Sequence, residues 1–473
     1  MIKKFIQYAS GNFLALILGF ISSPIITRLI LPEEMGKFSL FNTVTSLLFL
    51  FVMIGTDQAY VRFYNGGNGE GKKCLLRKCV SISLIVAFGT SLGILCFYKP
   101  LSNYIIGEIS FKVCILLIIN IITSVLQRFS LLELRMSMKA KTYSAMNVWH
   151  KLSYILMVFA VYIWLKNNSL VLMIATVASN LLCYLACVIL ERKVWFHLRK
   201  CTSVFKTREL IIYGFPFVFS NAINWIFEYM DRMSIRYFCD FTEIGIYSAA
   251  STIVSLLTSC QLAFTAFWVP VAYEKYENDP KCNDFFVKMN RVVSYGMIII
   301  AIGMVAGKDL IIFLLGDQYR NAMYIFPFLT FMPIMYTISE TTVMGINFKK
   351  KTKAHIVVAG ISAICNLAGN TVLVPMYGAK GAAISTGLSY VVFFAVRTII
   401  SLKLYKVEYK LKELCLALAF LCVLTVFSSF HSFDITIVIF TVVAVFATSI
   451  LYRDVVFDII CYLKKMCRRR KMK

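Results

Sequence analysis

Four polar side chains recur at helical spacing within a stretch that is otherwise apolar enough to cross a membrane. Asn221, Asn224, Glu228 and Asp231 are separated by three, four and three residues, which places them on one face of a helix. Arg232 follows Glu228 by four residues, so charges of both signs adjoin this face. Such a cluster can bind a charged substrate or couple protons within the bilayer. Alternatively, the charged residues mark the outer end of the helix, since Asp231 lies about 30 Å of helix beyond the start of the apolar stretch.

Other apolar stretches also contain polar residues. Glu340 is a candidate for substrate binding or ion coupling, because a carboxylate within a span is costly to retain without a role. A structural hydrogen bond or ion pair is the alternative for Glu340. Arg28 ends the first apolar stretch and either faces a cavity or extends its charged head to the membrane surface. Asn366 and Asn370, one helical turn apart, either contact substrate or hold helices together.

Long apolar helices must position these residues. The chain is 59% hydrophobic and 15% charged with a mean hydropathy of +0.75, whereas charged residues approach about a quarter of a soluble domain. Apolar runs of about twenty residues recur along the whole length, so we expect an all-α, polytopic membrane protein. The fourteen expected transmembrane helices are at 9–30, 38–56, 79–98, 111–132, 148–165, 168–190, 211–232, 246–270, 289–307, 320–346, 355–374, 379–401, 412–430 and 434–451.

Lysine and arginine are distributed unevenly between the expected loops. With a cytoplasmic N-terminus, the inner segments hold 38 of them and the outer segments 10, which predicts that both termini are cytoplasmic. This bias accounts for the formal charge of +25 without nucleic acid as a partner. The basic tail from Lys464 to Lys473 fits an anionic inner leaflet, and the loops Glu191 to Glu209 and Arg397 to Glu413 are expected to lie on the membrane surface. Arg128 and Glu133 either line the mouth of a cavity or anchor their helix.

The sequence gives little support to metal or nucleotide chemistry. The fifteen cysteines are scattered, without a CxxC pair or a Cys/His cluster, and are expected to be packing residues that form neither a metal site nor a disulfide. Residues 66–73, GGNGEGKK, nearly match a phosphate-binding loop, but the final lysine offers no hydroxyl for magnesium and the segment joins two spans. The four histidines are assigned no chemistry. We therefore expect no cofactor, no ATP hydrolysis and no enzymatic activity.

A short motif occurs twice in the chain. Glu34 to Ser39 and Glu243 to Ser248 both read E-x-G-x-aromatic-S and are 209 residues apart. A second pair, K-x-K-T at 139–142 and 349–352, has an offset of 210. These offsets predict an internal repeat.

The repeat divides the chain into two six-helix lobes, residues 1–200 and 205–405, followed by two appended helices and a basic cytoplasmic tail at 406–473. Because six is even, both lobes enter the membrane in the same direction. Two such lobes can rock about a site between them, and parallel repeats of this kind are typical of transporters.

Three stretches resemble the polysaccharide transport, or oligosaccharide flippase, family of the multidrug/oligosaccharidyl-lipid/polysaccharide (MOP) exporter superfamily. They are residues 27–40, TRLILPEEMGKFSL, the region 214–247, and residues 366–383. The last, NLAGNTVLVPMYGAKGAA, is similar to the family's N-x-x-x-N-x-x-x-x-P-x-x-G-x-x-G-A-A pattern. Together with the length and the number of spans, the likeness covers nearly the whole chain.

The resemblance implies a flippase that moves a polyprenyl-diphosphate-linked oligosaccharide, a repeat unit of O-antigen, capsule or another surface polysaccharide, across the bacterial cytoplasmic membrane by alternating access. It implies an ion gradient or the membrane potential as the energy source, without a cofactor. The implied partners are the lipid-linked oligosaccharide, membrane lipids and polysaccharide polymerase machinery.

An arginine near the position of Arg28 can meet the pyrophosphate in this family. The other residues expected to bind substrate or to couple its movement are Glu228, Asp231, Arg232, Glu340, Asn366 and Asn370. One alternative is a cation-coupled drug or small-molecule antiporter of the same superfamily. A membrane glycosyltransferase or polymerase is the alternative from another class, and it would need a long outer loop with carboxylates.

Overall fold

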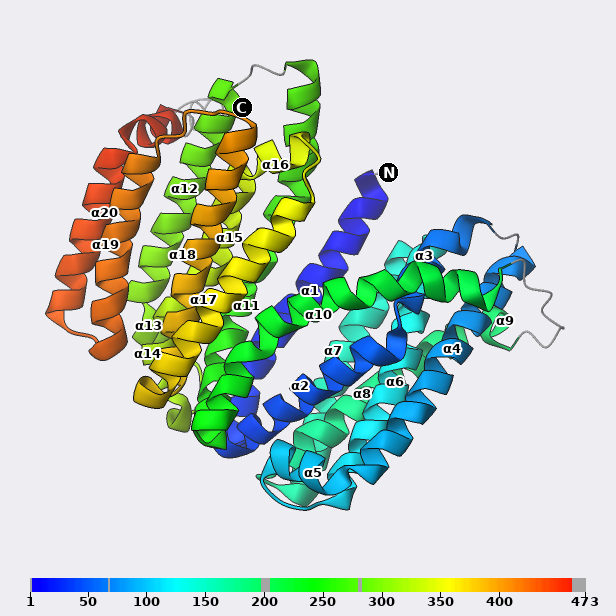
Figure 1. Ribbon diagram of the computed structural model, residues 1–473. Coiled ribbons are helices and arrows are strands. Elements are labelled where there is room, and N and C mark those ends of the chain that lie inside the picture. The colour runs from blue at the N-terminus through cyan, green and yellow to red at the C-terminus, as the bar shows by residue number, and fades with distance from the viewer. Residues whose placement is uncertain (1, 67–68, 197–204, 280–282, 462–473) are drawn as a thin grey trace, which may run out of the picture. The chain divides into compact units, whose positions relative to one another are not determined.

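The computed structural model describes residues 2–66, 69–196, 205–279 and 283–461 (Figure 1). All regular elements in these ranges are helices, which confirms the expected all-α class. The basic tail from Lys464 to Lys473 and residues 197–204 of the loop after Glu191 lie outside the described residues. Expectations for these two segments therefore stay predictions.

Contacts divide the chain into two compact units, Met1–Arg236 with Asp240–Ser248 and Tyr237–Cys239 with Ala249–Lys473. The expected boundaries near residues 200 and 405 were placed by the repeat in the sequence. A division by contacts does not test them, so they stay a prediction. The first unit contains α1 (Ile2–Leu29), α2 (Pro32–Met53), α3 (Thr56–Phe63), the short 3-10 helix η1 (Tyr64–Gly66), α4 (Gly69–Cys96), α5 (Tyr98–Ile106), α6 (Phe111–Met136), α7 (Ala140–Leu165), α8 (Ser169–Leu190), α9 (Arg192–Trp195), α10 (Thr207–Phe238) and the start of α11 (Phe241–Asn278).

The second unit begins within α11, after Ser248. Figure 1 shows α12, α19 and α20 as neighbouring rods within it. Its further helices are α12 (Asn283–Ala306), α13 (Lys308–Phe313), η2 (Asp317–Tyr319), α14 (Ala322–Leu329), α15 (Phe331–Thr342), α16 (Met344–Phe348), α17 (Lys353–Tyr377), α18 (Ala379–Leu404), α19 (Leu411–Phe430) and α20 (Ile435–Leu451).

Eleven helices in the described residues are long and apolar enough to cross a membrane, or up to thirteen if each of two bent pairs forms one span. The polytopic architecture is therefore confirmed, whereas the expected count of fourteen is not reproduced. The difference includes α1 (Ile2–Leu29), because the part of this helix that is described with its side chains begins only at Leu14.

The stretch expected as one helix at 320–346 is divided into α14, α15 and α16. Pro333 explains the first break, because it has no N–H to donate to the carbonyl of Leu329 four residues earlier. The Thr330 hydroxyl donates to the Pro327 carbonyl at 2.6 Å, and the Thr337 hydroxyl donates to the Pro333 carbonyl at 2.6 Å. Hydroxyls thus add hydrogen bonds to carbonyls in a segment whose helical ladder is interrupted.

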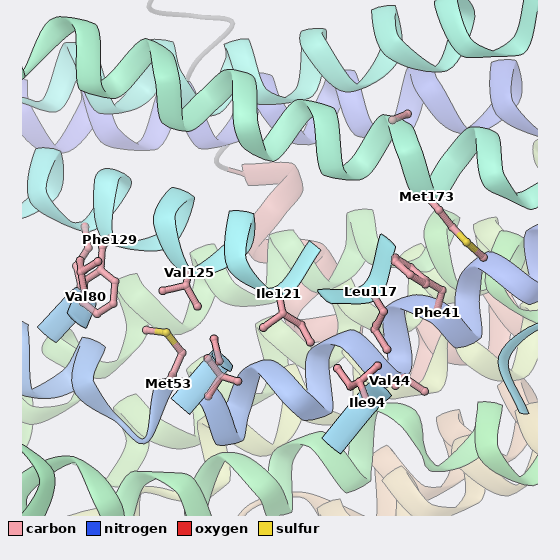
Figure 2. Packing of buried hydrophobic residues seen from close by; sticks show 14 of the residues in the cluster. Phe41, Val44, Met53, Val80, Ile94, Leu117, Ile121, Val125, Phe129 and Met173 are labelled. Carbon is pink, nitrogen blue, oxygen red and sulfur yellow. The ribbon is translucent and has the colours of Figure 1, made fainter. Parts of the chain in front are cut away.

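The core of the first unit contains a regular apolar stripe on α6. Its four members, Leu117, Ile121, Val125 and Phe129, recur every four residues and are fully buried. Figure 2 shows this stripe beside buried side chains of α2, including Phe41 and Val44, and of α4. Lipid tails are as apolar as these side chains, so the contact stabilises the helix pair mainly through close packing.

The two copies of the repeated motif contact each other within the first unit. A Cβ atom on Gly36 would lie 1.9 Å from the carbonyl oxygen of Phe241, and one on Gly245 would lie 1.8 Å from the carbonyl oxygen of Pro32. The hydroxyls of Ser39 and Ser248, 209 positions apart, are within 2.7 Å of each other. Glycine at both positions therefore permits backbone contact between the beginnings of α2 and α11.

Candidate functional site

The first candidate site is a polar cluster in which α10 meets the beginnings of α2 and α11. Asp231 is buried and accepts a hydrogen bond from the hydroxyl of Tyr247. The Arg232 Nε atom donates to the Ser248 hydroxyl at 3.4 Å, and Ser248 contacts Ser39. We call these five residues the α10 cluster.

The helix that contains the α10 cluster extends further than the sequence indicated. The expected end was residue 232, but α10 continues to Phe238. Asp231 and Arg232 therefore lie inside the helix, and their charges do not mark its last turn. Glu228 is exposed one turn earlier, where its carbonyl accepts a hydrogen bond from the Arg232 Nη1 atom at 3.3 Å.

Arg236 on the same helix has a structural role. Its Nε atom donates to the carbonyl of Tyr104 at 3.0 Å, and its Nη2 atom donates to the carbonyl of Asn103 at 3.3 Å. Both carbonyls belong to the last turn of α5, where cationic side chains bind unpaired carbonyls favourably. The guanidinium also lies 4.4 Å from the ring centroid of Phe241.

Arg28 is the exposed cation of the first unit's candidate set. It occupies the last turn of α1, four residues after Pro24. No hydrogen bond or ion pair joins Arg28 to another residue in the described part of the chain. Among the described residues, none therefore has to be displaced from its guanidinium by an anionic ligand.

The second candidate site is a buried ion pair in the second unit. The Arg397 Nη1 atom on α18 lies 2.8 Å from the Glu340 Oε1 atom on α15, and both side chains are less than a tenth exposed. The same nitrogen donates to the Ser339 hydroxyl at 2.6 Å. The Arg397 guanidinium also lies 5.3 Å from the ring centroids of both Tyr336 and Phe393. We call Glu340 and Arg397 the α15–α18 ion pair.

Arg397 corrects an expectation from the sequence. It was expected to begin a loop on the membrane surface, but α18 continues to Leu404 and Arg397 is buried inside it. The loop assignment overlooked that Arg397 still lies within the apolar run at 379–401. A charge inside a predicted span was the signal that could have identified a partner for Glu340.

Asn366 and Asn370 lie in the contact between α17 and α18, and both are buried. The Asn366 Nδ2 atom donates to the Thr386 hydroxyl at 3.0 Å, and the Asn370 Nδ2 atom donates to the Asn366 Oδ1 atom at 3.2 Å. The Ser385 hydroxyl donates to the Asn366 carbonyl at 2.8 Å. These bonds join two spans, which is the usual use of small polar residues in membranes. A role of the two amides in substrate binding stays a prediction.

Arg128 and Glu133 on α6 also have partners within the first unit. The Arg128 Nη2 atom lies 3.0 Å from the Asp57 Oδ2 atom on α3. Glu133 is buried and accepts hydrogen bonds from the hydroxyls of Tyr60 and Tyr64. Both charged residues therefore connect α6 to the segment that follows α2.

No group of three His, Cys, Asp or Glu side chains in the described residues is arranged to hold a metal ion. The need for a cofactor remains a matter of prediction. Cys74 is disulfide-bonded, which corrects the expectation that no cysteine forms a disulfide.

Residues 1–274, more than half of the chain, match the family described as polysaccharide biosynthesis protein. The chain belongs to this family. Two of the stretches that carry the sequence resemblance, 27–40 and 214–247, lie within the matched range. The expected membership of a polysaccharide family is thereby confirmed.

Relatives of this polysaccharide biosynthesis protein extend over most of its length. The capsular polysaccharide biosynthesis protein CapF of Staphylococcus aureus is 21% identical over 410 residues, which cover 82% of this chain and 96% of CapF. The probable low-salt glycan biosynthesis flippase Agl15 of Haloferax volcanii is 22% identical over 413 residues, which cover 84% of this chain and 81% of Agl15.

Solved structures agree with the family on the fold. The lipid II flippase MurJ, in an inward closed conformation, has a TM-score of 0.71 at 17% identity, covering 95% of this chain and 100% of MurJ. An inward-facing multidrug resistance MATE transporter of the MOP superfamily has a TM-score of 0.55 at 14% identity, covering 84% of this chain and 97% of that transporter. The chain therefore has the polytopic helical fold of these two structures.

Proposed function

We propose that this protein is a flippase that moves polyprenyl-diphosphate-linked oligosaccharide repeat units, for capsule, O-antigen or another surface polysaccharide, across the cytoplasmic membrane. The observation that carries the proposal is its fold likeness to a lipid II flippase over 95% of the chain, in a protein of the polysaccharide biosynthesis family. The relatives named for capsular polysaccharide and glycan biosynthesis support the substrate class.

The charged residues in the two units fit the chemistry of such a substrate. A diphosphate carries negative charge and sugars carry hydroxyls, so both need polar partners when they leave water. Arg28 is our candidate for the diphosphate, because it is an exposed cation whose guanidinium has no ion-pair partner among the described residues. Exposed Glu228 and the adjacent Arg232 are candidates for the sugar hydroxyls. The polyprenyl tail can remain in the lipid beside the protein.

The α15–α18 ion pair is our candidate for coupling in the second unit. A buried carboxylate paired with a guanidinium loses its attraction when it binds a proton, because the neutral acid no longer balances the cation. Proton binding at Glu340 would therefore weaken the contact between α15 and α18. An ion gradient could drive transport in this way without a cofactor.

A cation-coupled antiporter for drugs or other small molecules is the second candidate function. It is favoured by the likeness to MATE transporters, which share the superfamily fold. The lower TM-score, 0.55 against 0.71, and the smaller share of this chain, 84% against 95%, make it the weaker proposal. In either case we place both termini in the cytoplasm, on the distribution of Lys and Arg.

Deletion of the gene tests the proposal in the cell. We expect lipid-linked oligosaccharide to accumulate in the inner leaflet of the cytoplasmic membrane and surface polysaccharide to be lost, because no carrier moves the repeat unit outward. A membrane-impermeant lectin measures the loss of surface polysaccharide on intact cells, and the same lectin on permeabilised cells measures the accumulation in the inner leaflet. Unchanged surface polysaccharide together with new drug sensitivity would favour the antiporter instead.

Arg28→Ala is the matched residue test. It should abolish complementation of the deletion strain while the variant reaches the membrane at the wild-type level. Arg62→Ala on α3, which removes another exposed arginine of the first unit, serves as the control and should complement. Full complementation by Arg28→Ala would remove Arg28 from the site.

A further inference from the structure

A chain of hydrogen bonds crosses four helices of the first unit. The His150 Nε2 atom on α7 lies 2.9 Å from the Asn180 Oδ1 atom on α8. The Asn180 Nδ2 atom donates to the Asn120 Oδ1 atom on α6 at 3.1 Å and to the Ser124 hydroxyl at 3.2 Å. The Asn120 Nδ2 atom donates to the Thr45 hydroxyl on α2 at 3.2 Å. We call His150, Asn180, Asn120 and Thr45 the imidazole–amide chain.

The imidazole–amide chain lies in the part of the fold that crosses the membrane. All four of its helices are candidate spans. Thr45, Asn120 and Asn180 are buried, and His150 is half-buried. An unpaired polar group costs several kcal/mol in hydrocarbon, so each amide is held to its neighbours. The imidazole–amide chain is therefore stable only when every donor in it faces an acceptor from one end to the other.

The imidazole–amide chain can donate its hydrogen bonds either toward α2 or toward α7, because each amide has a donor end and an acceptor end. In the structure, both oxygens point toward α7 and both nitrogens toward α2. This direction requires a hydrogen on the His150 Nε2 atom. If Nε2 carries no hydrogen, it can no longer donate to Asn180 and needs a donor itself. The Ser179 hydroxyl, 3.5 Å away, is one such donor, and the Asn180 amide, at 2.9 Å, is the nearer one once both amides turn round. The Thr45 hydroxyl serves either direction, since a hydroxyl both donates and accepts.

Few charged groups surround the imidazole. Lys151 follows it on α7 with an exposed side chain. Residues 14–27 of α1, 38–53 of α2 and the whole of α8 contain no Asp, Glu, Lys or Arg. On α6, Arg128 is paired with Asp57, and the buried carboxylate of Glu133 accepts hydrogen bonds from Tyr60 and Tyr64 instead of from the ring. The other titratable groups nearby on α7 and α8 are Tyr154 and Cys183, which are ordinarily uncharged at neutral pH. These segments thus supply no carboxylate to the ring, and a proton bound there adds a net charge.

We propose that His150 is the coupling-proton site of the first unit. With both ring nitrogens protonated, Nε2 can only donate, and the imidazole–amide chain is held in the direction that the structure has. When the proton leaves Nε2, the neutral ring accepts a hydrogen bond and the chain reverses. Proton binding thus selects one of two hydrogen-bonded states shared by α2, α6, α7 and α8, which is the bistable element that a proton-driven carrier requires. The inference rests on the proposed function and specifies its energy source.

Nitrogen NMR of the full chain in lipid nanodiscs tests the site without any substrate. The chain has four histidines, so ring ¹⁵N labelling is simple to read, and His150→Gln assigns the His150 signals. We expect the ¹⁵N shifts of this ring to change with pH as the ring gains and loses a proton. In Asn120→Asp, which places a carboxylate beside Asn180 without touching the ring, the midpoint should rise by about one pH unit, a tenfold increase in proton affinity.

The double variant Asn120→Asp/Asn180→Leu distinguishes an effect transmitted through the hydrogen bonds of Asn180 from a direct electrostatic effect of the new carboxylate on the ring. If the imidazole–amide chain transmits the effect, the midpoint of His150 titration should be nearly the same in the double variant as in Asn180→Leu alone. A ring that does not titrate, or a rise that persists without Asn180, would overturn the proposal. Should Asn180→Leu fail to fold, Asn180→Thr provides the same comparison with a smaller polar residue.

Proton uptake gives a second measurement that uses protons alone as the probe. Proteoliposomes with an entrapped pH dye should take up fewer protons after an acid jump with His150→Gln than with wild type. If the protein is a flippase with another coupling site, it complements the deletion strain although the His150 ¹⁵N shifts do not change with pH. Failure of this inference is therefore distinguishable from failure of the proposed function.

Discussion

At the scale of single residues, the α15–α18 ion pair is where charge and burial conflict most strongly. Two opposite charges in an apolar interior are costly to desolvate, and their attraction offsets this cost only while both are present. Glu340→Gln keeps the shape of the side chain but leaves Arg397 buried without a counter-charge. We expect this variant to lose on the order of 3 kcal/mol of folding free energy and to abolish polysaccharide export while still reaching the membrane.

A double variant separates a structural role from a coupling role. Glu340→Gln/Arg397→Gln removes both charges and should recover most of the thermal stability, because no uncompensated charge remains. If the pair couples transport to ions, export stays absent in the double variant. Thermal unfolding in detergent and surface polysaccharide in the deletion strain are the two measurements. Recovery of export together with stability would show that the pair only holds α15 to α18.

The sequence was informative about which residues are unusual and uninformative about their partners. Glu340 could be identified because a carboxylate interrupts an apolar run. Its partner Arg397 could not, because the pairing depends on how two helices distant in sequence are rotated toward each other. His150 was overlooked for a related reason, since its proposed role follows from amides on two other helices and a hydroxyl on a third.

At the scale of elements, the contact between the two motif copies depends on the absence of side chains at Gly36 and Gly245. Alanine is ordinarily favoured over glycine inside a helix by roughly 1 kcal/mol. At Gly36, however, its Cβ would lie 1.9 Å from a backbone carbonyl oxygen, so the two helices would have to move apart. We expect Gly36→Ala to lower the unfolding temperature and the yield of folded protein, with a cost of roughly 1–3 kcal/mol.

Gly360→Ala on α17 is the matched control, because no atom lies within 4 Å of its added Cβ. It should be neutral or slightly stabilising. Thermal unfolding followed by size-exclusion chromatography compares the variants. Equal stability of Gly36→Ala and Gly360→Ala would contradict the close contact of α2 and α11.

Hydropathy predicted most of the long helices, because length and apolar composition are local properties. It did not predict where helices break or end. The division of 320–346 depends on proline positions and hydroxyl bonding, and the extension of α10 to Phe238 is accompanied by the contacts of Asp231 and Arg236. Those contacts join segments that are separated in the chain.

At the scale of the whole molecule, the repeat in the sequence was the strongest indication of a transporter. Its offset of 209 residues separates the two serines that contact each other, Ser39 and Ser248. The fold likeness to MurJ and to a MATE transporter agrees with that indication. Neither the repeat nor the fold specifies the sugar, because the contacts that select a substrate involve few residues.

The most direct test of the account is flipping by the purified chain. Vesicles are prepared with a polyprenyl-diphosphate-linked oligosaccharide in both leaflets, and a glycosidase that cannot cross the membrane is added outside. We predict that vesicles containing the protein expose nearly all of the oligosaccharide to the enzyme, because inner-leaflet molecules are carried outward. The experiment is repeated with imposed pH gradients of either direction. If cleavage is always limited to the outer-leaflet fraction, as in protein-free vesicles, the assignment as a flippase is contradicted.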